Sequence, residues 1–460
     1  MPVILALILA FGTTAHAADR PNVIVVMTDD QAATTMWAMP QTRELIGGVG
    51  TTFVNSFAVQ PLCCPSRATF LTGQHSHNHG VITNHPPLGG YPRLNHLQTL
   101  PVWLRARGYF TGFVGKYLNH YGYESRTEIP PGWTAWQALV GPTVLRMYDY
   151  IINDNGRLVL HGEAEGDYQT DVLARRAVSL IWLAPRPYFL WVATLAPHRE
   201  GCGSSCDSPR PAPRHAGRFA TVKLPRGPAF NELNVEDKPV GIRNRARLTE
   251  DEIARMRTKH RLRAESLLAV DDLVASVVRA ASERGDLNNT VIVFTSDNGW
   301  LAGEHRIEGK NRVYEPAIRV PLLARGPGFP AGLQARQLVG NIDLAPTIVE
   351  LTGATSGLVM DGRSLLPLVQ DATRGSDRIL LLQRPPNGVS RAAFTAVRTE
   401  RYVYAEYTIT GERELYDLQR DPYQLRSRHD DPAYADILRL LARELDAQRV
   451  CAGETCSRGR

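Results

Sequence analysis

The sequence predicts an α/β fold in which helices flank a large, mixed but mostly parallel sheet. Three apolar runs rich in β-branched residues have the character of strands that are buried on both faces of such a sheet. They cover residues 22–27, 188–195 and 291–295. Two long stretches with the apolar spacing of a helix, 167–184 and 249–284, lie between these runs. Together these segments place most of the chain in one layered domain.

The last part of the chain has a different pattern. From about Asp377, short segments alternate polar and apolar residues between turn residues, as in a small antiparallel sheet, and a helix is predicted over 432–448. The length of 460 residues favours one large domain plus a smaller one. We therefore expect a large domain over 18–376 and a C-terminal subdomain over 377–460.

Shorter elements complete the large domain. We expect a short strand at 109–114, a further strand at 319–323, and a helix that starts at Asp343. The net charge of +6, from 52 Lys and Arg against 46 Asp and Glu, is modest for this length. Because no basic tail is present, nucleic acid is not an expected partner, and only a mild preference for anions follows.

The N-terminus has the pattern of a signal peptide. An apolar run over 3–11 is followed by small residues, and Ala15-His16-Ala17 fits cleavage before Ala18. Residues 1–17 are therefore expected to be removed from a secreted or otherwise extracytoplasmic protein. The run is too short for stable membrane insertion. No Lys or Arg precedes it, so either the signal is atypical or the true start lies upstream. A buried N-terminal helix is the alternative interpretation.

Four of the six cysteines form two close pairs in the sequence. These pairs are Cys202 with Cys206 and Cys451 with Cys456. In an exported protein such spacing favours two local disulfides over a zinc site, because no histidine ligands lie near them in the sequence. The remaining two cysteines, Cys63 and Cys64, are then unpaired, and as neighbours they cannot readily pair with each other.

Cys63 and Cys64 open the sequence CCPSRATFLTG, which predicts a loop entering a helix that ends at Gly73. The free N–H groups at a helix N-terminus favour a bound anion, and Arg67 adds a fixed positive group. This stretch therefore indicates a site for an oxyanion.

Acidic and amide side chains follow two of the predicted strands. Asp29 and Asp30 come after the first strand, and Asp297 and Asn298 come after the strand at 291–295. Ligands in open α/β sheets bind at the carboxyl ends of strands. Four oxygen ligands suit a hard cation such as calcium or magnesium. The alternative for the first pair alone is a solvated turn with Asp30 as a helix cap.

Lys116 and His198 also follow predicted strands, and Lys310 lies in the segment after the second acidic pair. Taken singly, a lysine is more often solvated and a histidine in a polar loop more often structural. The three histidines of His75-Ser76-His77-Asn78-His79 are interpreted as polar loop surface rather than as zinc ligands.

Several sequence blocks resemble the type I sulfatases of the alkaline-phosphatase-like superfamily. They occur in order across nearly the whole chain: TDDQ, CCPSRATFLTG, GKYLN, APH, TSDNG and GKNRVYEPAIRVPLLARGPG. Within that family the N-acetylglucosamine-6-sulfatase branch is the one that four segments resemble most: CCPSR, GKYLN, LLAVDDLV and DLNNTVIVFTSDNG. The resemblance implies an alkaline-phosphatase-like fold and hydrolysis of sulfate monoesters.

By the same resemblance, a maturation enzyme oxidises Cys63, the first position of C-x-P-x-R, to formylglycine. One hydroxyl of the hydrated aldehyde attacks sulfur, and the second expels sulfate as the aldehyde reforms. One calcium ion would be held by an oxygen of modified Cys63 and by four further residues: Asp29, Asp30, Asp297 and Asn298. Arg67 would stabilise the modified residue, Lys116 and Lys310 would bind sulfate oxygens, and His198 would contact or protonate the leaving oxygen.

The sequence departs from many family members at Leu118, where they have a histidine two positions after the lysine. His305 and His120 are both candidates to replace its contact. Two other functions stay open at this point. A phosphatase or phosphodiesterase on the same fold would use Thr or Ser with two zinc ions, and an unmodified Cys63 would leave a non-catalytic anion- or glycan-binding protein. Substrate specificity is expected in the loops at 75–96 and 199–218.

Overall fold

The computed structural model describes residues 20–201, 207–371, 373–375, 377–386 and 392–456. Its main feature is a ten-stranded mixed sheet in the order β13-β2-β12-β9-β1-β8-β4-β5-β6-β7. The five central strands, from β9 to β5, are parallel to one another. The strands are β1 (Asn22–Thr28), β2 (Thr51–Phe53), β4 (Phe110–Gly115), β5 (Ala135–Leu139), β6 (Tyr150–Asp154), β7 (Arg157–His161), β8 (Tyr188–Ala193), β9 (Thr290–Ser296), β12 (Leu322–Arg325) and β13 (Leu333–Ala335).

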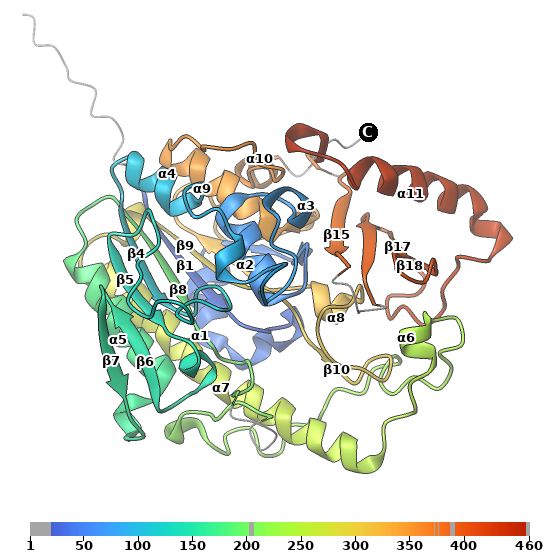
Figure 1. Ribbon diagram of the computed structural model, residues 1–460, viewed down its shortest axis with the longest axis horizontal. Coiled ribbons are helices and arrows are strands. Elements are labelled where there is room, and N and C mark those ends of the chain that lie inside the picture. The colour runs from blue at the N-terminus through green and yellow to red at the C-terminus, as the bar shows by residue number, and fades with distance from the viewer. Residues whose placement is uncertain (1–19, 202–206, 372, 376, 387–391, 457–460) are drawn as a thin grey trace, which may run out of the picture.

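Helices cover both faces of this sheet (Figure 1). On one face lie α2 (Cys63–Thr72), α4 (Leu100–Ala106) and α9 (Leu344–Thr352), and on the other lie α5 (Gln169–Leu183) and α7 (Glu250–Glu283). Side chains alternate along β1: Val23, Val25 and Met27 pack in the core of the first layer, and Ile24 and Val26 in the core of the second. The continuous apolar run thus serves two cores, which confirms the predicted fold class.

The shorter elements around these layers connect the strands. They are α1 (Pro40–Thr42), β3 (Ser56–Phe57), α3 (Ser76–His79), α6 (Val240–Arg243), β10 (Leu301–Ala302), β11 (Glu308–Gly309), α8 (Glu315–Ile318), β14 (Val339–Gly340) and α10 (Leu366–Gln370). Within the part of the chain that the structure describes, none of the helices is both long and apolar enough to cross a membrane.

The prediction of a strand at 319–323 is wrong in its position, because the observed strand begins three residues later. Glu315–Ile318 forms the short helix α8, and the strand β12 covers Leu322–Arg325, where it pairs antiparallel with β9. The apolar residues of RVPLL suggested a strand, but Pro321 lacks the N–H that a central ladder needs, so regular pairing starts after it. The edge strands β5, β6 and β7 were not predicted, because their short sequences show neither a continuous apolar run nor a clear alternation, although β5 and β6 are mostly buried and only β7 is largely exposed.

A four-stranded antiparallel sheet forms the C-terminal part of the chain, as predicted. Its strands are β15 (Leu380–Arg384), β16 (Phe394–Arg398), β17 (Tyr402–Tyr407) and β18 (Arg413–Asp417). The helix α11 (Ala435–Gln448) packs on one face, where Leu441 and Leu445 meet Val397 and Leu415. The other face contacts the segment around α8 through a shared core. The domain boundary at 376/377 stays a prediction.

The predicted signal peptide and the Cys202–Cys206 pair lie outside the described residues. The second predicted disulfide, between Cys451 and Cys456, is present. Cys63 and Cys64 are both free and buried. The structure thus separates one structural cysteine pair from the two cysteines of the CCPSR segment.

Candidate active site

Four strands that are neighbours in the sheet bring the predicted site residues to one edge. In the order β9, β1, β8 and β4 these strands are parallel, so their carboxyl ends point the same way. The residues that follow these ends are Asp297 and Asn298, Asp29 and Asp30, His198, and Lys116. Side chains from distant parts of the chain therefore meet at the carboxyl ends of the strands, which is where α/β sheets bind ligands.

Cys63 is the first residue of α2 and its side chain is directed into this group. Its Sγ lies 3.3 Å from Asp29 Oδ1 and 2.6 Å from Lys310 Nζ. Burial and the nearby Asp29 carboxylate raise the pKa of the Cys63 thiol far above its usual range, although the two lysines oppose this. Since the thiolate is the reactive form of cysteine, the unmodified side chain is a poor nucleophile here.

Arg67 lies one helical turn after Cys63 and is completely buried. Its Nε donates to Asp297 Oδ2 at 2.8 Å, its Nη1 donates to the carbonyl oxygens of Lys116 and Tyr117, and its Nη2 lies 3.5 Å from Asp29 Oδ2. One guanidinium thus joins the ends of β9, β1 and β4. The planar, always charged group of arginine suits such a buried junction.

Two lysines complete the positive charge around the carboxylates. Lys116 is buried and pairs with Asp29, and Lys310 donates to Asp30 as well as to Cys63. Burial disfavours the charged ammonium, but the carboxylate partners outweigh it and raise the pKa of both lysines. Both ammonium groups therefore stay charged near Cys63 and can attract an anion.

The pKa values of the three carboxyl groups, those of Asp29, Asp30 and Asp297, shift in different directions in this environment. Burial alone would raise all three pKa values. The charge of Lys116 holds the pKa of Asp29 well below its usual range, and Lys310 lowers that of Asp30. Burial and the charge of Asp29 raise the pKa of Asp297. Negative charge is thus concentrated on the two residues that follow β1.

The residues present fit a hard cation. Ligand atoms of Asp29, Asp30, Cys63 and His198 all lie within 4.8 Å of one another. Asp297 Oδ1 accepts from the backbone N of Asp30 at 3.1 Å. Asn298 Oδ1 is buried without a hydrogen-bond partner among the described residues, as expected of an oxygen that faces a metal ion. Calcium and magnesium ions prefer oxygen donors of this kind.

His198 lies beside the same group. Its Nε2 is 3.6 Å from Asp30 Oδ2, and its Nδ1 lies 2.6 Å from the carbonyl oxygen of Arg199. A carbonyl can only accept, so Nδ1 carries the hydrogen and Nε2 faces the site. Burial lowers the pKa of His198 to about 4 although both neighbouring aspartates oppose it.

Arg263 is a site residue that the sequence did not reveal. It projects from the middle of α7, donates through Nη2 to the carbonyl oxygen of Asp30, and stacks 4.4 Å from the ring centre of Trp300. Asp30 itself has a left-handed backbone with φ of 67°. Arg263 thus supports an unusual conformation next to the predicted metal ligands, from a helix whose charged residues carry no motif.

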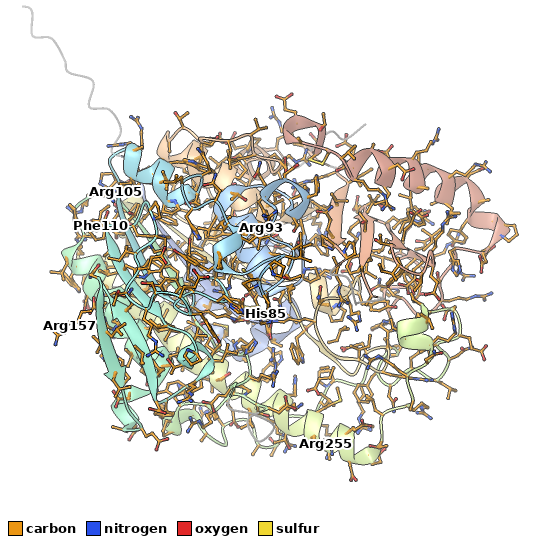
Figure 2. All side chains as sticks on the ribbon, in the orientation of Figure 1. His85, Arg93, Arg105, Phe110, Arg157 and Arg255 are labelled. Atoms are coloured by element: carbon orange, nitrogen blue, oxygen red, sulfur yellow. A yellow bond between two sulfur atoms is a disulfide. The ribbon has the colours of Figure 1, made fainter. Side chains whose placement is uncertain are left out.

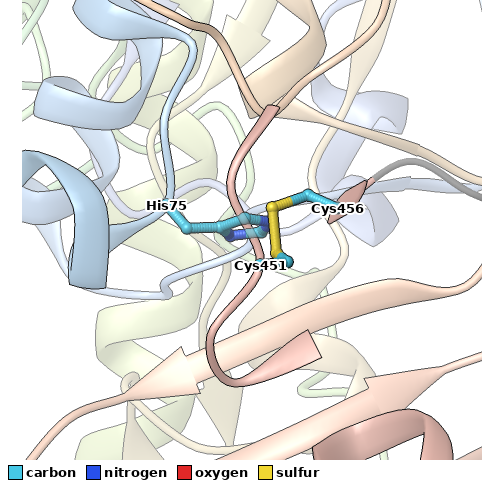
Figure 3. Close-up of side chains that lie close together, drawn as sticks. All are labelled: His75, Cys451 and Cys456. Carbon is cyan, nitrogen blue, oxygen red and sulfur yellow. A yellow bond between two sulfur atoms is a disulfide. The ribbon is translucent and has the colours of Figure 1, made fainter. Parts of the chain in front are cut away.

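The interpretation of His75, His77 and His79 as loop surface is wrong. Ser76–His79 forms the helix α3, and His75 is only 4% exposed. Its ring lies against the Cys451–Cys456 disulfide (Figure 3). His77 Nε2 lies 2.9 Å from the carbonyl oxygen of Cys451. Both sulfurs are already bonded to each other, so this cluster secures the C-terminal segment rather than a metal.

The two candidates for the missing family histidine have other partners. His305 is buried and lies 2.7 Å from Glu232 Oε2 through Nδ1. His120 Nε2 lies 2.7 Å from Nδ1 of His85, which is in the middle of the molecule in Figure 2. Leu118 is packed in the core. Neither imidazole forms a hydrogen bond with Cys63 among the described residues.

The first and second parts of the loop at 199–218 contact different elements. Near its start Glu200 accepts from the backbone N of Met147, and further on Arg214 pairs with Asp171 of α5 and Asp272 of α7. This second part therefore packs on the outer helical layer. Its predicted role in specificity stays a prediction.

Comparison with protein families gives two overlapping matches. A family model described as Sulfatase matches residues 21–354, which is more than half of the chain. The chain belongs to the sulfatase family. A second model, N-sulphoglucosamine sulphohydrolase, C-terminal, matches residues 303–451. The chain is therefore a sulfuric ester hydrolase, as the sequence blocks predicted.

Individual relatives agree with this assignment. The chain is 34% identical over 502 residues to N-acetylglucosamine-6-sulfatase of Capra hircus, covering 97% of this chain and 87% of the relative. It is 38% identical over 397 residues to the Homo sapiens enzyme of the same name, covering 81% and 69%. A solved structure described as a complex with its substrate D-glucosamine-2-N,6-O-disulfate superposes with a TM-score of 0.77 at 24% identity, over 94% of this chain and 98% of the other. That similarity shows the shared fold.

Proposed function

We propose that this sulfatase hydrolyses a sulfate monoester of a sulfated amino sugar, with Cys63 converted to formylglycine as the nucleophile. The observation that carries the proposal is the place of Cys63. It starts a helix in a C-x-P-x-R sequence, its thiol has an unfavourable pKa for direct attack, and it contacts Asp29 and Lys310. Oxidation would replace an inert thiol with an aldehyde hydrate that bears two hydroxyl groups.

Formylglycine hydrate supplies one hydroxyl that attacks sulfur and a second that releases the sulfate as the aldehyde reforms. The chain's own residues then have separate tasks. Asp29 lies beside the nucleophile and is placed to accept its proton. Lys116 and Lys310 attract the sulfate oxygens, and Arg67 fixes the ends of three strands around them.

A calcium ion would be held by the carboxylates of Asp29, Asp30 and Asp297 and by the amide oxygen of Asn298. When bound, it supplies positive charge next to the nucleophile and the sulfate. His198 presents Nε2 to the same space and would contact the oxygen of the leaving sugar. Because its Nδ1 holds a hydrogen for Arg199, Nε2 must first gain a proton before it can donate one.

The preference for an amino sugar rests on the relatives. Two of them are named N-acetylglucosamine-6-sulfatase, and the solved structure with the same fold holds a disulfated glucosamine. We also propose that residues 1–17 direct export before maturation, as the signal-like N-terminus and the Cys451–Cys456 disulfide favour. A formylglycine-generating enzyme is then a required partner.

Mass spectrometry of the tryptic peptide that contains Cys63 tests the mechanism before any substrate is known. Conversion of the thiol to an aldehyde changes the peptide mass by a fixed amount, and fragmentation assigns the change to Cys63 or to Cys64. We expect it at Cys63 alone in protein that releases sulfate. Active protein in which Cys63 is an intact thiol would disprove the proposed nucleophile.

A further inference from the structure

A cavity of about 130 Å³ lies between α7 and the loops that carry the proposed metal ligands. One water needs about 10–15 Å³ of such a volume, so the cavity has room for several waters and thus for one small ring. Thr34 on its lining is exposed, so the cavity opens to solvent there. Most of the lining comes from four parts of the chain: residues 32–35, Pro197, the N-terminal half of α7 and residues 300–308.

The cavity adjoins the reaction centre through Asp30. Arg263 on its lining donates through Nη2 to the carbonyl oxygen of Asp30, and Asp30 Oδ1 lies 4.0 Å from Cys63 Sγ. Pro197, also on the lining, directly precedes His198, whose Nε2 is 3.6 Å from Asp30 Oδ2. The cavity is therefore next to the position that the proposed mechanism gives to the leaving sugar.

Much of the lining is apolar. Met256 and Leu267 of α7 contribute aliphatic surface, and Trp300 contributes an aromatic ring that stacks 4.4 Å from the guanidinium of Arg263. Ligand pockets typically combine such surfaces with a few polar groups that fix the orientation of the ligand. A sugar ring matches this pattern, because its C–H groups form an apolar face and its hydroxyl groups lie around the rim.

The charged groups on the lining balance one another. Lys259 and Arg263 are positive, Glu304 and Glu308 are negative, and Lys259 Nζ lies 2.9 Å from Glu308 Oε2. Burial and the neighbouring arginines lower the pKa of His260 to about 4, so its imidazole is neutral near pH 7. A cavity without excess charge favours a neutral ligand over an acidic one.

His260 brings a polar atom that needs a partner. It lines the cavity, and its Nε2 is buried and forms no hydrogen bond within the part of the chain that the structure describes. A nitrogen of neutral imidazole either donates or accepts, and a hydroxyl group can satisfy it in both cases. Glu304 on the same lining accepts from the backbone N of Ala302 at 2.6 Å through Oε2, and a carboxylate has further lone pairs for hydroxyl donors. Both side chains therefore suit the hydroxyl groups of a sugar.

We propose that this cavity binds an uncharged sugar ring next to the sulfated one, and that Trp300 and His260 determine the preference for it. The inference rests on the proposed function and narrows it: the preferred substrate is an oligosaccharide in which the sulfated amino sugar is joined to a neutral sugar. The C–H face of this second ring packs against Trp300, and its hydroxyl groups form hydrogen bonds with His260 and Glu304.

Three substrates with the same N-acetylglucosamine-6-sulfate unit test this preference. One is the methyl glycoside, one is linked through C1 to galactose, and one is linked through C1 to glucuronic acid. The kcat/KM of each is measured with the wild type, His260→Phe, Trp300→Ala and Trp300→Phe. Arg255→Gln serves as the matched control, because Arg255 is exposed on the same helix as His260 and does not line the cavity (Figure 2).

We expect the wild type and Arg255→Gln to prefer the galactose-linked substrate over the other two by about fivefold or more, since one hydrogen bond between neutral groups contributes about this factor. His260→Phe and Trp300→Ala should each lose at least about five times more kcat/KM on that substrate than on the methyl glycoside. Trp300→Phe keeps an aromatic ring and should retain the preference. A wild type that does not distinguish the substrates or prefers glucuronic acid, or a preference that survives in both His260→Phe and Trp300→Ala, would overturn the subsite.

Binding measurements keep this test separate from the proposed chemistry. In a Cys63→Ala background, which lacks the proposed nucleophile, calorimetry compares the Kd of the galactose-linked substrate and of the methyl glycoside with and without His260→Phe. Tighter binding of the galactose-linked substrate that depends on His260 supports the subsite even if the wild type releases no sulfate. Release of sulfate without such a difference in Kd retains the proposed function and rejects the subsite. Thermal unfolding of each variant, together with Trp300→Phe, distinguishes lost recognition from a damaged fold.

Discussion

Cys63 and Cys64 are neighbours in the sequence, are both buried, and have different surroundings. Cys64 packs in the core of the layer formed by α2, α4 and α9, and its backbone N donates to Asn84 Oδ1 at 2.9 Å. Cys63 points instead toward Asp29 and Lys310. The one-residue offset on the helix thus separates a side chain that packs in the core from the side chain of the proposed nucleophile.

Substitution of each cysteine tests this difference. Cys63→Ala should reduce sulfate release by about 10⁴-fold or more, because it removes the proposed nucleophile. Cys64→Ala should keep most of the activity and lose only the stability of a small buried side chain. Initial rates with one sulfated sugar and circular dichroism of both variants provide the measurement. An active Cys63→Ala beside an inactive Cys64→Ala would reverse the assignment.

Calcium removal tests the oxygen donors at the ends of β1 and β9. A strong chelator should abolish activity and lower the melting temperature, and calcium but not zinc should restore both. At a hundred times its Kd, calcium should add about 3 kcal/mol to the free energy of unfolding. Asn298→Ala should weaken this gain, whereas Asp430→Asn, at an exposed carboxylate, should not. Full turnover in chelator would contradict the site.

At the scale of elements, α3 and the residues beside it join α2, which starts with the proposed nucleophile, to the C-terminal segment. Asp361 accepts from the backbone N of His75 and of Gly453, each at 2.8 Å, and its own N donates to the carbonyl oxygen of Gly73, which ends α2. Gly73 has φ of 67°, a conformation that glycine adopts without strain. The short helix therefore acts as a connection and not as a metal site.

His79 makes this connection sensitive to acid. Its Nδ1 accepts from the backbone N of Val81 at 3.0 Å, so protonation there would break a hydrogen bond. Burial lowers the pKa of His79 to about 3. Because the unfolded chain binds the proton more readily, His79 stabilises the fold fully above about pH 6.5, and this contribution falls as the pH drops toward 3.

We expect the wild type to lose about 1 kcal/mol of stability per pH unit from His79 in this range. His79→Asn should flatten the pH dependence by that amount, because the Asn oxygen can still accept from Val81 but does not titrate. Urea-denaturation midpoints between pH 4 and 7 measure the slopes. Equal slopes for the two proteins would refute this role of His79.

At the scale of the whole molecule, the C-terminal sheet helps to place Lys310. The core between that sheet and the segment around α8 contains Tyr314, Tyr416 and Leu382. At its centre, Glu414 is completely buried and accepts from three tyrosine hydroxyls, including that of Tyr314 at 2.7 Å. The loop with Lys310 is therefore fixed by residues about a hundred positions later in the chain.

Glu414→Leu tests this link. It leaves three buried hydroxyls without an acceptor, so the free energy of unfolding should fall by about 3 kcal/mol or more. The kcat should fall as well, because Lys310 loses its support. Glu406→Leu is the matched control, since Glu406 is partly exposed and its loss should cost about 1 kcal/mol or less. Thermal unfolding and steady-state rates report both effects, and an unaffected kcat in Glu414→Leu would show that Lys310 is held independently.

The sequence by itself predicted the central buried strands and the polar residues that follow them, and it led to the proposal that Cys63 is the nucleophile. Buried strands are apolar on both faces, and the residues that follow them have local patterns that can be recognised without a structure. Asp29, Asp30, Asp297, Asn298 and Lys116 were identified in this way. The structure then brings them together because the strands that carry them are parallel neighbours.

Only the tertiary structure decided which other side chains surround these residues. Three charged residues form hydrogen bonds with partners far away in the chain: Arg263, Arg384 and Glu414. A lone charged residue on a helix or strand gives no local signal of such a partner. The histidines at 75–79 looked like surface for the same reason, since the C-terminal segment that buries them comes more than 370 residues later. Long-range packing, and not local pattern, therefore determined their surroundings.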